Sequence, residues 1–315
     1  MTKELAQAEE SKLRLPKFLR LSWNQQLSLW PYIFLIIPMA YFLFVRFVPT
    51  LSTINMSLRD WSLLMPEKEW VGFANYVRMF EDPKLIKAAT NTATIVLIMV
   101  PLQIIVALTI SVLLVRIPKG RGIYRLIYFI PFMTIAPVVG KVWKYILAVQ
   151  RGPINLVLQE LGLEQQPFLT SPDQALYLLI GVIVWSGIGF STVILVAGII
   201  QIPATYYEAA RIDGANGWQL FRHITLPLIN PALVFVTIIT TLRALREFTI
   251  PYVITPGSAI GGPLNSLLTL MIQVYVTGFR KMKMGYASAI TVCMLVIMMT
   301  ISLVQLRIMR RRIEY

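Results

Sequence analysis

Long apolar runs separated by shorter polar stretches dominate the chain. A membrane-spanning helix needs about 20 mostly apolar residues. Runs of that length lie at about residues 30–50, 92–115, 123–147, 175–199, 227–254 and 285–308. The pattern predicts an all-α membrane protein with six core transmembrane helices. We expect a cytoplasmic basic segment over 1–29, a transmembrane domain over 30–308 with a connecting loop at 201–227, and a basic tail over 309–315.

The composition agrees with a membrane protein. Hydrophobic residues make up 57% of the 315 residues and charged residues only 14%, with a mean hydropathy of +0.68. A water-soluble globule carries about twice that charged fraction. The single cysteine, Cys293, and the single histidine, His223, exclude a disulfide framework and leave too few ligands for a zinc site.

The net charge of +14 is explained by the membrane, so we expect no nucleic-acid partner. Lys and Arg are retained on the cytoplasmic side of a bilayer. Four basic segments should share that side, with both termini cytoplasmic: 1–29, 116–125, 200–226 and the tail. Loops 51–91, 148–174 and 255–284 should be external. Residues 12–23 mix basic and apolar side chains, which indicates contact with anionic membrane lipid.

Prolines interrupt several of the apolar runs. Pro101, Pro131, Pro137 and Pro231 remove backbone donors and should kink or interrupt the helices, as in a bundle that moves. The loop 255–284 holds ten residues, "LLTLMIQVYV", that are too few to cross a bilayer. We expect this loop to be re-entrant or interfacial.

The loop between the fourth and fifth runs carries helix boundaries in its sequence. Thr205 and Glu208 have the spacing of a capping box, which predicts a helix start. Gly214 can adopt the left-handed conformation that ends a helix. Asn216 and Gln219 predict a second cap. The loop should therefore form two short helices joined by a glycine turn.

These two helices should expose apolar side chains beside charged ones. The apolar residues concerned are Ala209, Ala210, Ile212, Leu220 and Phe221. Exposed apolar patches with polar rims mark protein partners. An amphipathic connector lying on the membrane explains the same pattern, and the residues alone leave both interpretations open.

Charged residues interrupt the fifth apolar run. Arg243, Arg246 and Glu247 should face protein or water, since a charge near the bilayer centre costs about 2.5–3.5 kcal/mol. Arg243 and Glu247 stand one helical turn apart, so they can form a buried salt bridge. A cavity-lining role on the solute pathway is the alternative. Further candidates for that pathway are Trp185, Ser186, Thr240, Thr241, Tyr286 and Ser288, each of which is also compatible with ordinary packing.

The loop carries a specific motif. Glu208-Ala209-Ala210 is followed after three residues by Gly214, and after nine more by Ile224, then Leu226-Pro227. This pattern resembles the EAA loop of permease subunits of binding-protein-dependent ABC importers. "EAARIDGANGWQLFRHITLPLINPAL", "WVGFANYVRMFEDP", "KGRGIYRLIYFIPFMTIAPVVGKVW" and "MGYASAI" are similar to the carbohydrate-importing branch, and together they extend the resemblance from about residue 30 to the C-terminus.

The resemblance implies a non-catalytic subunit in a bacterial or archaeal cytoplasmic membrane. It implies a second homologous permease, two ATPase subunits that bind ATP and Mg, and an extracytoplasmic solute-binding protein. It also implies that the loop contacts the ATPase and couples it to the membrane helices. The residues so implicated are Glu208, Ala209, Ala210, Arg211, Asp213, Gly214, Leu220, Phe221, Ile224, Leu226 and Pro227.

Several catalytic motifs are missing from the sequence. No G-x-x-x-x-G-K-[ST] phosphate loop occurs, so we expect no cofactor on this chain and ATP hydrolysis on a partner. No G-x-S-x-G or H-E-x-x-H motif occurs either, which disfavours a membrane enzyme. An ATP-independent secondary transporter of a polar solute is the alternative, weakened by the scarcity of intramembrane acids other than Glu247. The sequence does not separate sugars from glycerol phosphate, polyols or oligosaccharides.

Overall fold

The computed structural model describes residues 23–64, 68–117, 120–255 and 260–309, and their side chains except those of 23–29, 33, 121 and 125. The basic segment up to residue 22, Lys119 of the basic 116–125 turn and the tail from residue 310 lie outside the described residues. The chain divides into two compact units, Met1–Asn55 and Met56–Tyr315.

The first unit is a nearly continuous helix. Helix α2 (Trp23–Phe42) passes through a π-helical turn, η2 (Leu43–Phe47), into α3 (Val48–Ser57), whose end belongs to the second unit. The stretch Trp30–Ser57 is long and apolar enough to span a membrane, and its most hydrophobic window is entirely unburied within this chain.

Two long helices form the centre of the second unit, α5 (Pro83–Arg116) and α9 (Pro172–Ile200). Helix α5 begins where Asp82 Oδ1 accepts hydrogen bonds from the amides of Lys84 (2.9 Å) and Leu85 (3.3 Å). The two helices pack along each other around a buried core that includes Ile95, Met99, Leu179 and Ile183.

The six predicted spans correspond to four straight helical stretches and two bent helix pairs. Straight spans occur at Trp30–Ser57, Pro83–Arg116, Pro172–Ile200 and Met284–Met309, the last being α16. The bent pairs are Gly122–Met133 with Ala136–Ile146, at 96°, and Gly217–Leu228 with Asn230–Leu245, at 69°. They comprise α6 (Arg121–Met133) and α7 (Ala136–Ile146), then α11 to α13.

The interruption expected from the prolines in the runs 123–147 and 227–254 is therefore present at Pro137 and Pro231. Helix α7 begins beside Pro137, and helix α13 (Asn230–Leu245) begins beside Pro231. Proline has no amide hydrogen to continue the preceding helix but fits the first turn of a new one. A second break separates α13 from α14 (Thr249–Ile254).

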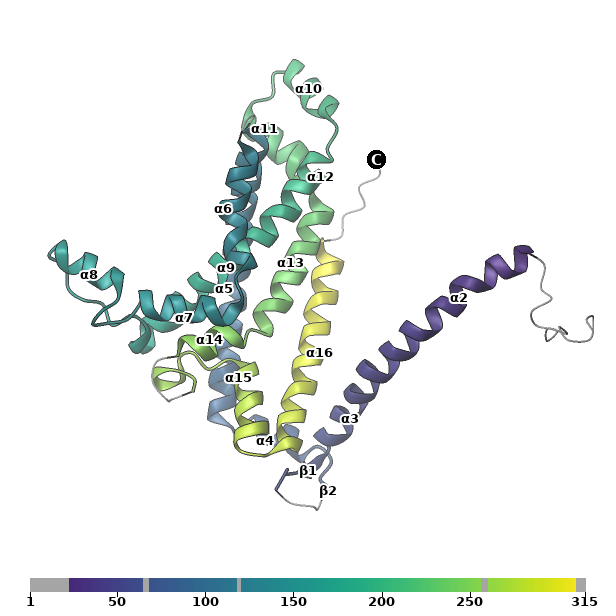
Figure 1. Ribbon diagram of the computed structural model, residues 1–315, viewed down its shortest axis with the longest axis vertical. Helices are drawn as coiled ribbons and strands as arrows, with labels where there is room; N and C mark the ends of the chain where they lie inside the picture. Colours follow the sequence, from purple (N-terminus) through teal and green to yellow (C-terminus); the bar gives the residue numbers. More distant parts are fainter. Residues whose placement is uncertain (1–22, 65–67, 118–119, 256–259, 310–315) are drawn as a thin grey trace, which may run out of the picture. The chain divides into compact units, whose positions relative to one another are not determined.

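One end of the second unit, termed the hairpin end, carries a small antiparallel sheet (Figure 1). Strand β1 (Arg59–Trp61) pairs with β2 (Lys68–Trp70) in the register Arg59↔Trp70 and Trp61↔Lys68. Ser62 forms a further bridge to Lys283. Helix α4 (Ala74–Met79) follows the sheet. Helix α8 (Pro153–Glu160) and η3 (Phe168–Thr170) connect α7 to α9.

The loop expected to be re-entrant packs against the hairpin end. It contains η5 (Pro263–Asn265), α15 (Leu270–Tyr275) and η6 (Val276–Arg280), which are all too short to span a membrane. Its buried residues Leu268 and Ile272 join Leu85, Tyr286 and Ile290 in one hydrophobic cluster. The segment is thus a folded part of the bundle that does not cross it.

The opposite end of the second unit, termed the loop end, carries the predicted helix pair (Figure 1). It consists of α10 (Ala204–Ile212), α11 (Gly217–Leu220), the π-helical turn η4 (Phe221–Thr225) and α12 (Leu226–Leu228). This loop joins the end of α9 to the start of α13, so any force on it reaches both helices.

Candidate functional site: the 201–228 loop and the polar cluster beneath it

Gly214 forms the turn that ends α10. Its φ of +82° lies in the left-handed region, as the sequence predicts. The Ala215 amide donates to Ala210 O (2.9 Å) and the Gly214 amide to Arg211 O (3.0 Å). These two bonds are the Schellman pattern, which satisfies carbonyls left free at a helix end. No atom lies within 4 Å of a Cβ built on Gly214, so the backbone conformation alone selects glycine here.

Asn216 and Gln219 form the predicted capping box at the start of α11. Asn216 Oδ1 accepts from the amides of Trp218 (3.1 Å) and Gln219 (3.0 Å), and Gln219 Oε1 accepts from the Asn216 amide (2.8 Å). The two sides of the loop are then joined by a hydrogen bond of 3.0 Å between the Tyr207 and Thr225 hydroxyls. The connection between α10 and α11 is thus fixed by the Schellman turn, the capping box and the hydrogen bond between Tyr207 and Thr225.

The predicted capping box of Thr205 and Glu208 was wrong. Helix α10 begins at Ala204, its N-cap residue is Pro203, and no side chain caps it. Pro203 adopts φ −59° and ψ 136°, an extended conformation that proline favours and from which a helix can start. Thr205 therefore already lies within the first helical turn.

The loop exposes a mixed apolar and charged face. Ile212 is 87% exposed, Trp218 65% and Tyr206 46%. Glu208, Arg211 and Asp213 are exposed around them. Leu220 and Phe221, expected on this face, are half-buried instead. The sequence analysis assigned no role to Trp218 or Tyr206, because neither belongs to the motif that marks this loop.

The motif residues divide between this face and the inner side of the loop. Ala209 and Gly214 are exposed with the charged residues, whereas Ala210, Leu220, Phe221, Ile224, Leu226 and Pro227 are half-buried. Leu226 packs on a buried cluster with Ile199 and Ile229. The inner residues therefore fix the loop to the ends of α9 and α13, and the outer residues are free to contact a partner.

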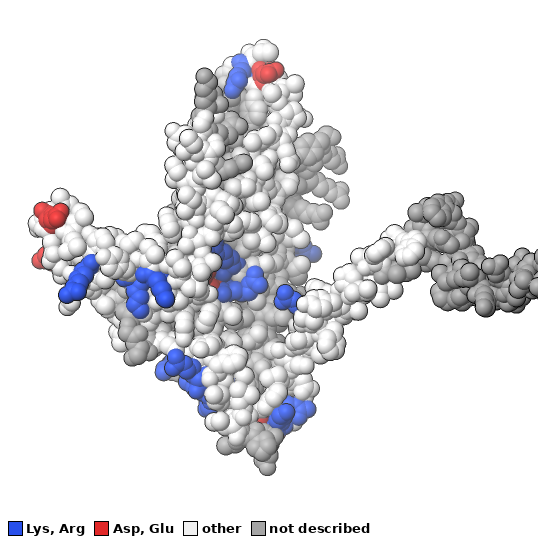
Figure 2. All heavy atoms as spheres, viewed as in Figure 1, with Lys and Arg blue, Asp and Glu red and all other residues white. Residues whose placement is uncertain are grey.

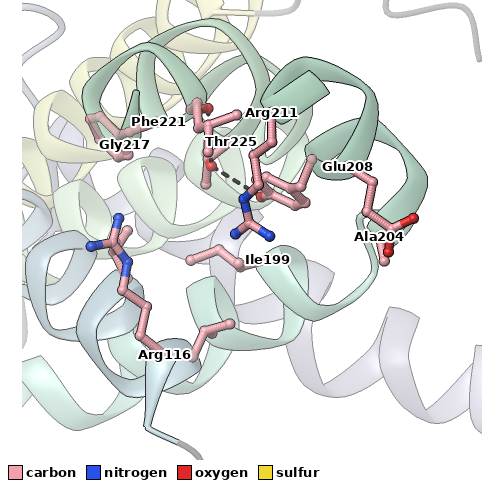
Figure 3. A pocket seen from close by; sticks show the side chains of 12 residues that line it. Arg116, Ile199, Ala204, Glu208, Arg211, Gly217, Phe221 and Thr225 are labelled. Atoms are coloured by element: carbon pink, nitrogen blue, oxygen red, sulfur yellow. Dashed lines mark hydrogen bonds between the residues drawn. The ribbon is translucent and has the colours of Figure 1, made fainter. Parts of the chain in front are cut away.

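A pocket of about 330 Å³ lies under the loop, between its helices and the end of α5. Figure 3 shows the Arg211 guanidinium turned into this pocket, the Arg116 guanidinium at its side, and the Glu208 carboxylate turned away from both. Thr225 and Ile199 form part of its wall. The pocket leaves space beneath the loop into which its side chains can move.

Beneath the loop, a polar cluster joins α5, α9 and α13 inside the bundle. Arg243 Nη2 donates to Ser186 Oγ at 2.8 Å. Gln103 Nε2 donates to Gly187 O (3.1 Å) and to Ser191 Oγ (2.8 Å). Gln103 Oε1 is buried without a partner. A Cβ on Gly187 would lie 2.6 Å from Arg243 Nη1 and 2.7 Å from Gln103 Oε1, so these side-chain ends would have to shift to admit any larger residue.

Glu247 belongs to the same region but does not continue the helix of Arg243. Helix α13 ends at Leu245, and the Glu247 carboxylate, 8% exposed at the residue level, accepts from the Ile250 amide (3.3 Å). Its charge and that of Arg243 attract each other. Both predicted interpretations, a structural charge pair and a cavity wall, stay predictions. Arg246, the third charge of this run, is exposed and donates through Nε to Leu242 O (3.2 Å).

The remaining pathway candidates are dispersed through the bundle. Thr240 is buried, and the buried Thr241 hydroxyl bonds to Thr237 O (2.8 Å) and Gln305 Nε2 (2.8 Å). Trp185 packs edge-on against Trp143 with ring centroids 5.5 Å apart. Tyr286 lies at the hairpin end, where its hydroxyl donates to Asp82 Oδ2 (3.1 Å). Ser288, two residues further on, is buried.

Among the predicted pathway candidates, the structure joins Ser186 and Arg243 directly by a hydrogen bond. Gln103 and Gly187 join the cluster without having been predicted. A glutamine within an apolar run was the available signal for Gln103. In the described part of the chain, no three His, Cys, Asp or Glu side chains are grouped so that they could hold a metal ion.

Comparison with known proteins decides the family. Residues 71–315 match the family described as binding-protein-dependent transport system inner membrane component. The chain belongs to this family of ABC-importer permeases. It is 32% identical to the probable ABC transporter permease protein YurN of Bacillus subtilis over 88% of this chain and 94% of that protein.

Two further relatives extend the comparison of this permease. It is 32% identical to the trehalose/maltose transport system permease protein MalF of Thermococcus litoralis, over 84% of this chain and 88% of that one. It has the fold of a chain in the crystal structure of a bacterial alginate ABC transporter in complex with a pentasaccharide-bound periplasmic protein. The TM-score is 0.77 at 23% identity, over 92% of this chain and 97% of the other. The predicted all-helical permease fold and the resemblance to this family are confirmed.

Proposed function

We propose that this permease is the transmembrane subunit of an ATP-driven importer, which moves a sugar or related solute from an extracytoplasmic binding protein into the cytoplasm by alternating access. A second homologous permease and two ATPase subunits complete the importer, and ATP and Mg bind to the ATPases. The membrane is the cytoplasmic membrane of a bacterium or archaeon. The loop end and both termini face the cytoplasm, and the hairpin end faces outward.

The 201–228 loop carries this proposal. It presents exposed Ile212, Trp218 and Tyr206 within a rim of charged side chains, on a backbone fixed by the Schellman turn and the capping box. A rigid apolar patch with a polar rim suits a protein partner. The ATPase is the partner that this family implies. Glu208 and Asp213 supply the polar rim of that contact, and Arg211 reaches from the same helix into the pocket beneath the loop.

The loop is connected to the bundle so that a push on it moves helices. It continues directly from α9 and into α13, and Asn230 Nδ2 at the start of α13 donates to Met309 O of α16 (2.9 Å). The bend of 69° between the loop helices and α13 converts motion of the loop along the membrane into tilting of α13. Small shifts at such packed junctions produce rigid-body movement of whole elements.

Support for a saccharide as the solute comes from the relatives. The Thermococcus litoralis protein is named for a trehalose/maltose transport system, and another relative, from Rhizobium radiobacter, is named for lactose transport. Within the bundle, the Ser186, Arg243 and Glu247 cluster offers donors and acceptors that could contact hydroxyl groups. Trp185, Thr240, Thr241, Arg246, Tyr286 and Ser288 stay candidates for other parts of the pathway.

Uptake by proteoliposomes tests the proposal against an ATP-independent secondary transporter. The chain is reconstituted with its sister permease, ATPase and binding protein, and uptake of radiolabelled neutral sugars (maltose, trehalose and lactose) and of acidic saccharides is measured. We expect uptake only with ATP and binding protein together. Uptake that proceeds without the ATPase and follows an imposed proton or sodium gradient would contradict the proposal and favour the secondary transporter.

A further inference from the structure

A second pocket lies at the hairpin end, which is the end of the second unit opposite to the loop (Figure 1). It measures about 220 Å³ and is lined by Lys84 at the start of α5, Gln273 of α15, Arg280 and Lys281 at the end of η6, and Asn265 of η5. Of the described residues that line it, none carries a carboxylate. Figure 2 shows basic side chains over this end of the molecule, near α15. The pocket therefore carries a concentrated positive charge.

The polar groups around this pocket are mainly hydrogen-bond donors. Lysine and arginine donate and cannot accept. Gln273 is 1% exposed, and its Nε2 is buried without a hydrogen-bond partner. A buried amide donor is almost always paired in a folded protein, so an unpaired one beside a cavity indicates a missing acceptor. The nearest acid along the chain, Asp82, is occupied by the α5 cap and by Tyr286.

The walls of the pocket are held in place by neighbouring helices. Asn91 Nδ2 donates to Asn265 O (2.8 Å) and Leu268 O (3.0 Å), and Thr92 Oγ1 accepts from the Leu270 amide (3.0 Å). Leu264 and Asn265 have φ of 49° and 60°, conformations that residues with a Cβ rarely adopt. Strain of this kind persists where surrounding contacts fix it, as they do here.

The Arg280 side chain is oriented by its neighbours. Its guanidinium donates hydrogen bonds to the hydroxyls of Tyr252 and Tyr275. These two tyrosines belong to an aromatic cluster with Phe248, whose ring centroid is 5.1 Å from that of Tyr252 and 5.3 Å from that of Tyr275. The Arg280 guanidinium is thus oriented by two tyrosines that are themselves fixed by packing against Phe248.

We propose that this pocket binds an oxyanion carried by the solute, a carboxylate, sulfonate or phosphate on a saccharide, where the solute enters the permease from outside. The outward orientation of the pocket rests on the proposed function. Lys84, Arg280 and Lys281 attract and bind the charged group, and Gln273 donates to one of its oxygens. A neutral sugar gains none of the charge-assisted bonds, so the pocket favours acidic saccharides.

Direct binding tests this assignment without ATP or transport. The full chain, with the subunits that co-purify with it, is reconstituted in phosphatidylcholine nanodiscs and titrated with sodium glucuronate or glucose by calorimetry. We expect glucuronate to bind and glucose to bind at least about tenfold more weakly, which is the loss expected for one charge-assisted hydrogen bond. Lys84→Gln and Arg280→Gln should each weaken glucuronate binding by about tenfold.

Two further variants test whether binding depends on the pocket itself. One controls for the general charge of the protein surface, and the other controls for loss of folding. Lys87→Gln removes an exposed charge from the same helix outside the pocket and should leave the affinity within about twofold. Gln273→Met replaces the unpaired donor with an apolar side chain of similar size. It should keep the melting temperature and weaken binding.

The outcomes distinguish a solute from a lipid as the source of the oxyanion. They also distinguish failure of the pocket assignment from failure of the proposed function. Equal binding of glucose and glucuronate, or an unchanged affinity in Arg280→Gln, would overturn the proposal. Binding of added phosphatidylglycerol with none of glucuronate would assign the oxyanion to a lipid headgroup and overturn the solute assignment. Since the titration needs no ATP, ATP-dependent uptake by proteoliposomes made from the same purified complex would show that only the pocket assignment had failed.

Discussion

The Arg243 guanidinium donates a hydrogen bond of 2.8 Å to Ser186 Oγ, and this contact joins the helix that follows the loop to the helix that precedes it. Both helices lead directly into the 201–228 loop. The same guanidinium lies beside Gly187 and near the Gln103 side chain of α5. Three helices are thus connected by polar contacts in an otherwise apolar interior. We infer that this cluster makes them move together when the loop is displaced.

Glu247→Gln tests whether the negative charge of Glu247 stabilises the folded protein. The variant keeps an acceptor for the Ile250 amide but loses the attraction to Arg243. We expect the free energy of unfolding to fall by about 1–3 kcal/mol, the range for a buried polar group that loses its partner. Thermal denaturation in detergent measures it. Arg246→Gln, at an exposed neighbour, should change stability by less than about 0.5 kcal/mol. A stable Glu247→Gln protein with altered solute preference would instead assign Glu247 to the pathway.

Gly187→Ala tests the close approach of α5, α9 and α13. The added methyl group would collide with Arg243 and Gln103. We expect a loss of roughly 1–3 kcal/mol, as for an overpacked core. Gly181→Ala on the same helix is the matched control, because no atom lies within 4 Å of its Cβ. This control should gain roughly 0.5–1 kcal/mol from helix propensity. Equal melting temperatures for the two variants would show that the cluster does not constrain the helices.

Ile212→Ser tests the exposed face of the loop. Ile212 is 87% exposed, so its removal should leave the melting temperature of the permease unchanged. Recovery of the ATPase in a pull-down should fall several-fold if this side chain anchors the contact. Leu161→Ser, 69% exposed in the connection between α8 and α9, should not affect recovery. Full recovery of the ATPase with Ile212→Ser would place the contact elsewhere.

Reporter fusions test the proposed orientation in the membrane. Fusions at residues 120, 215 and 313 should report a cytoplasmic location, and fusions near 70, 160 and 260 an external one, because basic residues are retained inside. An external signal from residue 215 would contradict the orientation and with it the contact between the loop and the ATPase.

The sequence predicts local features of the loop well. Gly214 adopts the expected left-handed conformation, and Asn216 with Gln219 forms the expected capping box. Each feature depends on a few consecutive residues, so local chemistry decides it. The cap at Thr205 failed because Pro203 two residues earlier already starts the helix.

Features that depend on distant residues were not predictable in the same way. The prolines predict breaks within the spans 123–147 and 227–254, but the local sequence does not give the angles of 96° and 69° between the helices on either side. The contact of Gln103 with Gly187 joins residues 84 positions apart. Nothing in either local sequence specifies that meeting, which is set by the packing of α5 on α9.

The most direct test of the account compares Gly214→Val with Gly214→Asn. Valine is strained at a φ of +82° by about 1–2 kcal/mol, whereas asparagine tolerates this conformation. Neither residue meets another atom within 4 Å at its Cβ, and no spanning helix is altered. Both variants should therefore insert and pair with the sister permease.

The measurement is ATP turnover by the complex in liposomes, with and without solute-loaded binding protein. We predict that Gly214→Asn keeps the stimulation by binding protein and that Gly214→Val loses it, together with recovery of the ATPase in a pull-down. Normal stimulated turnover in the Gly214→Val complex would contradict the account and show that residues 201–228 are a passive connector.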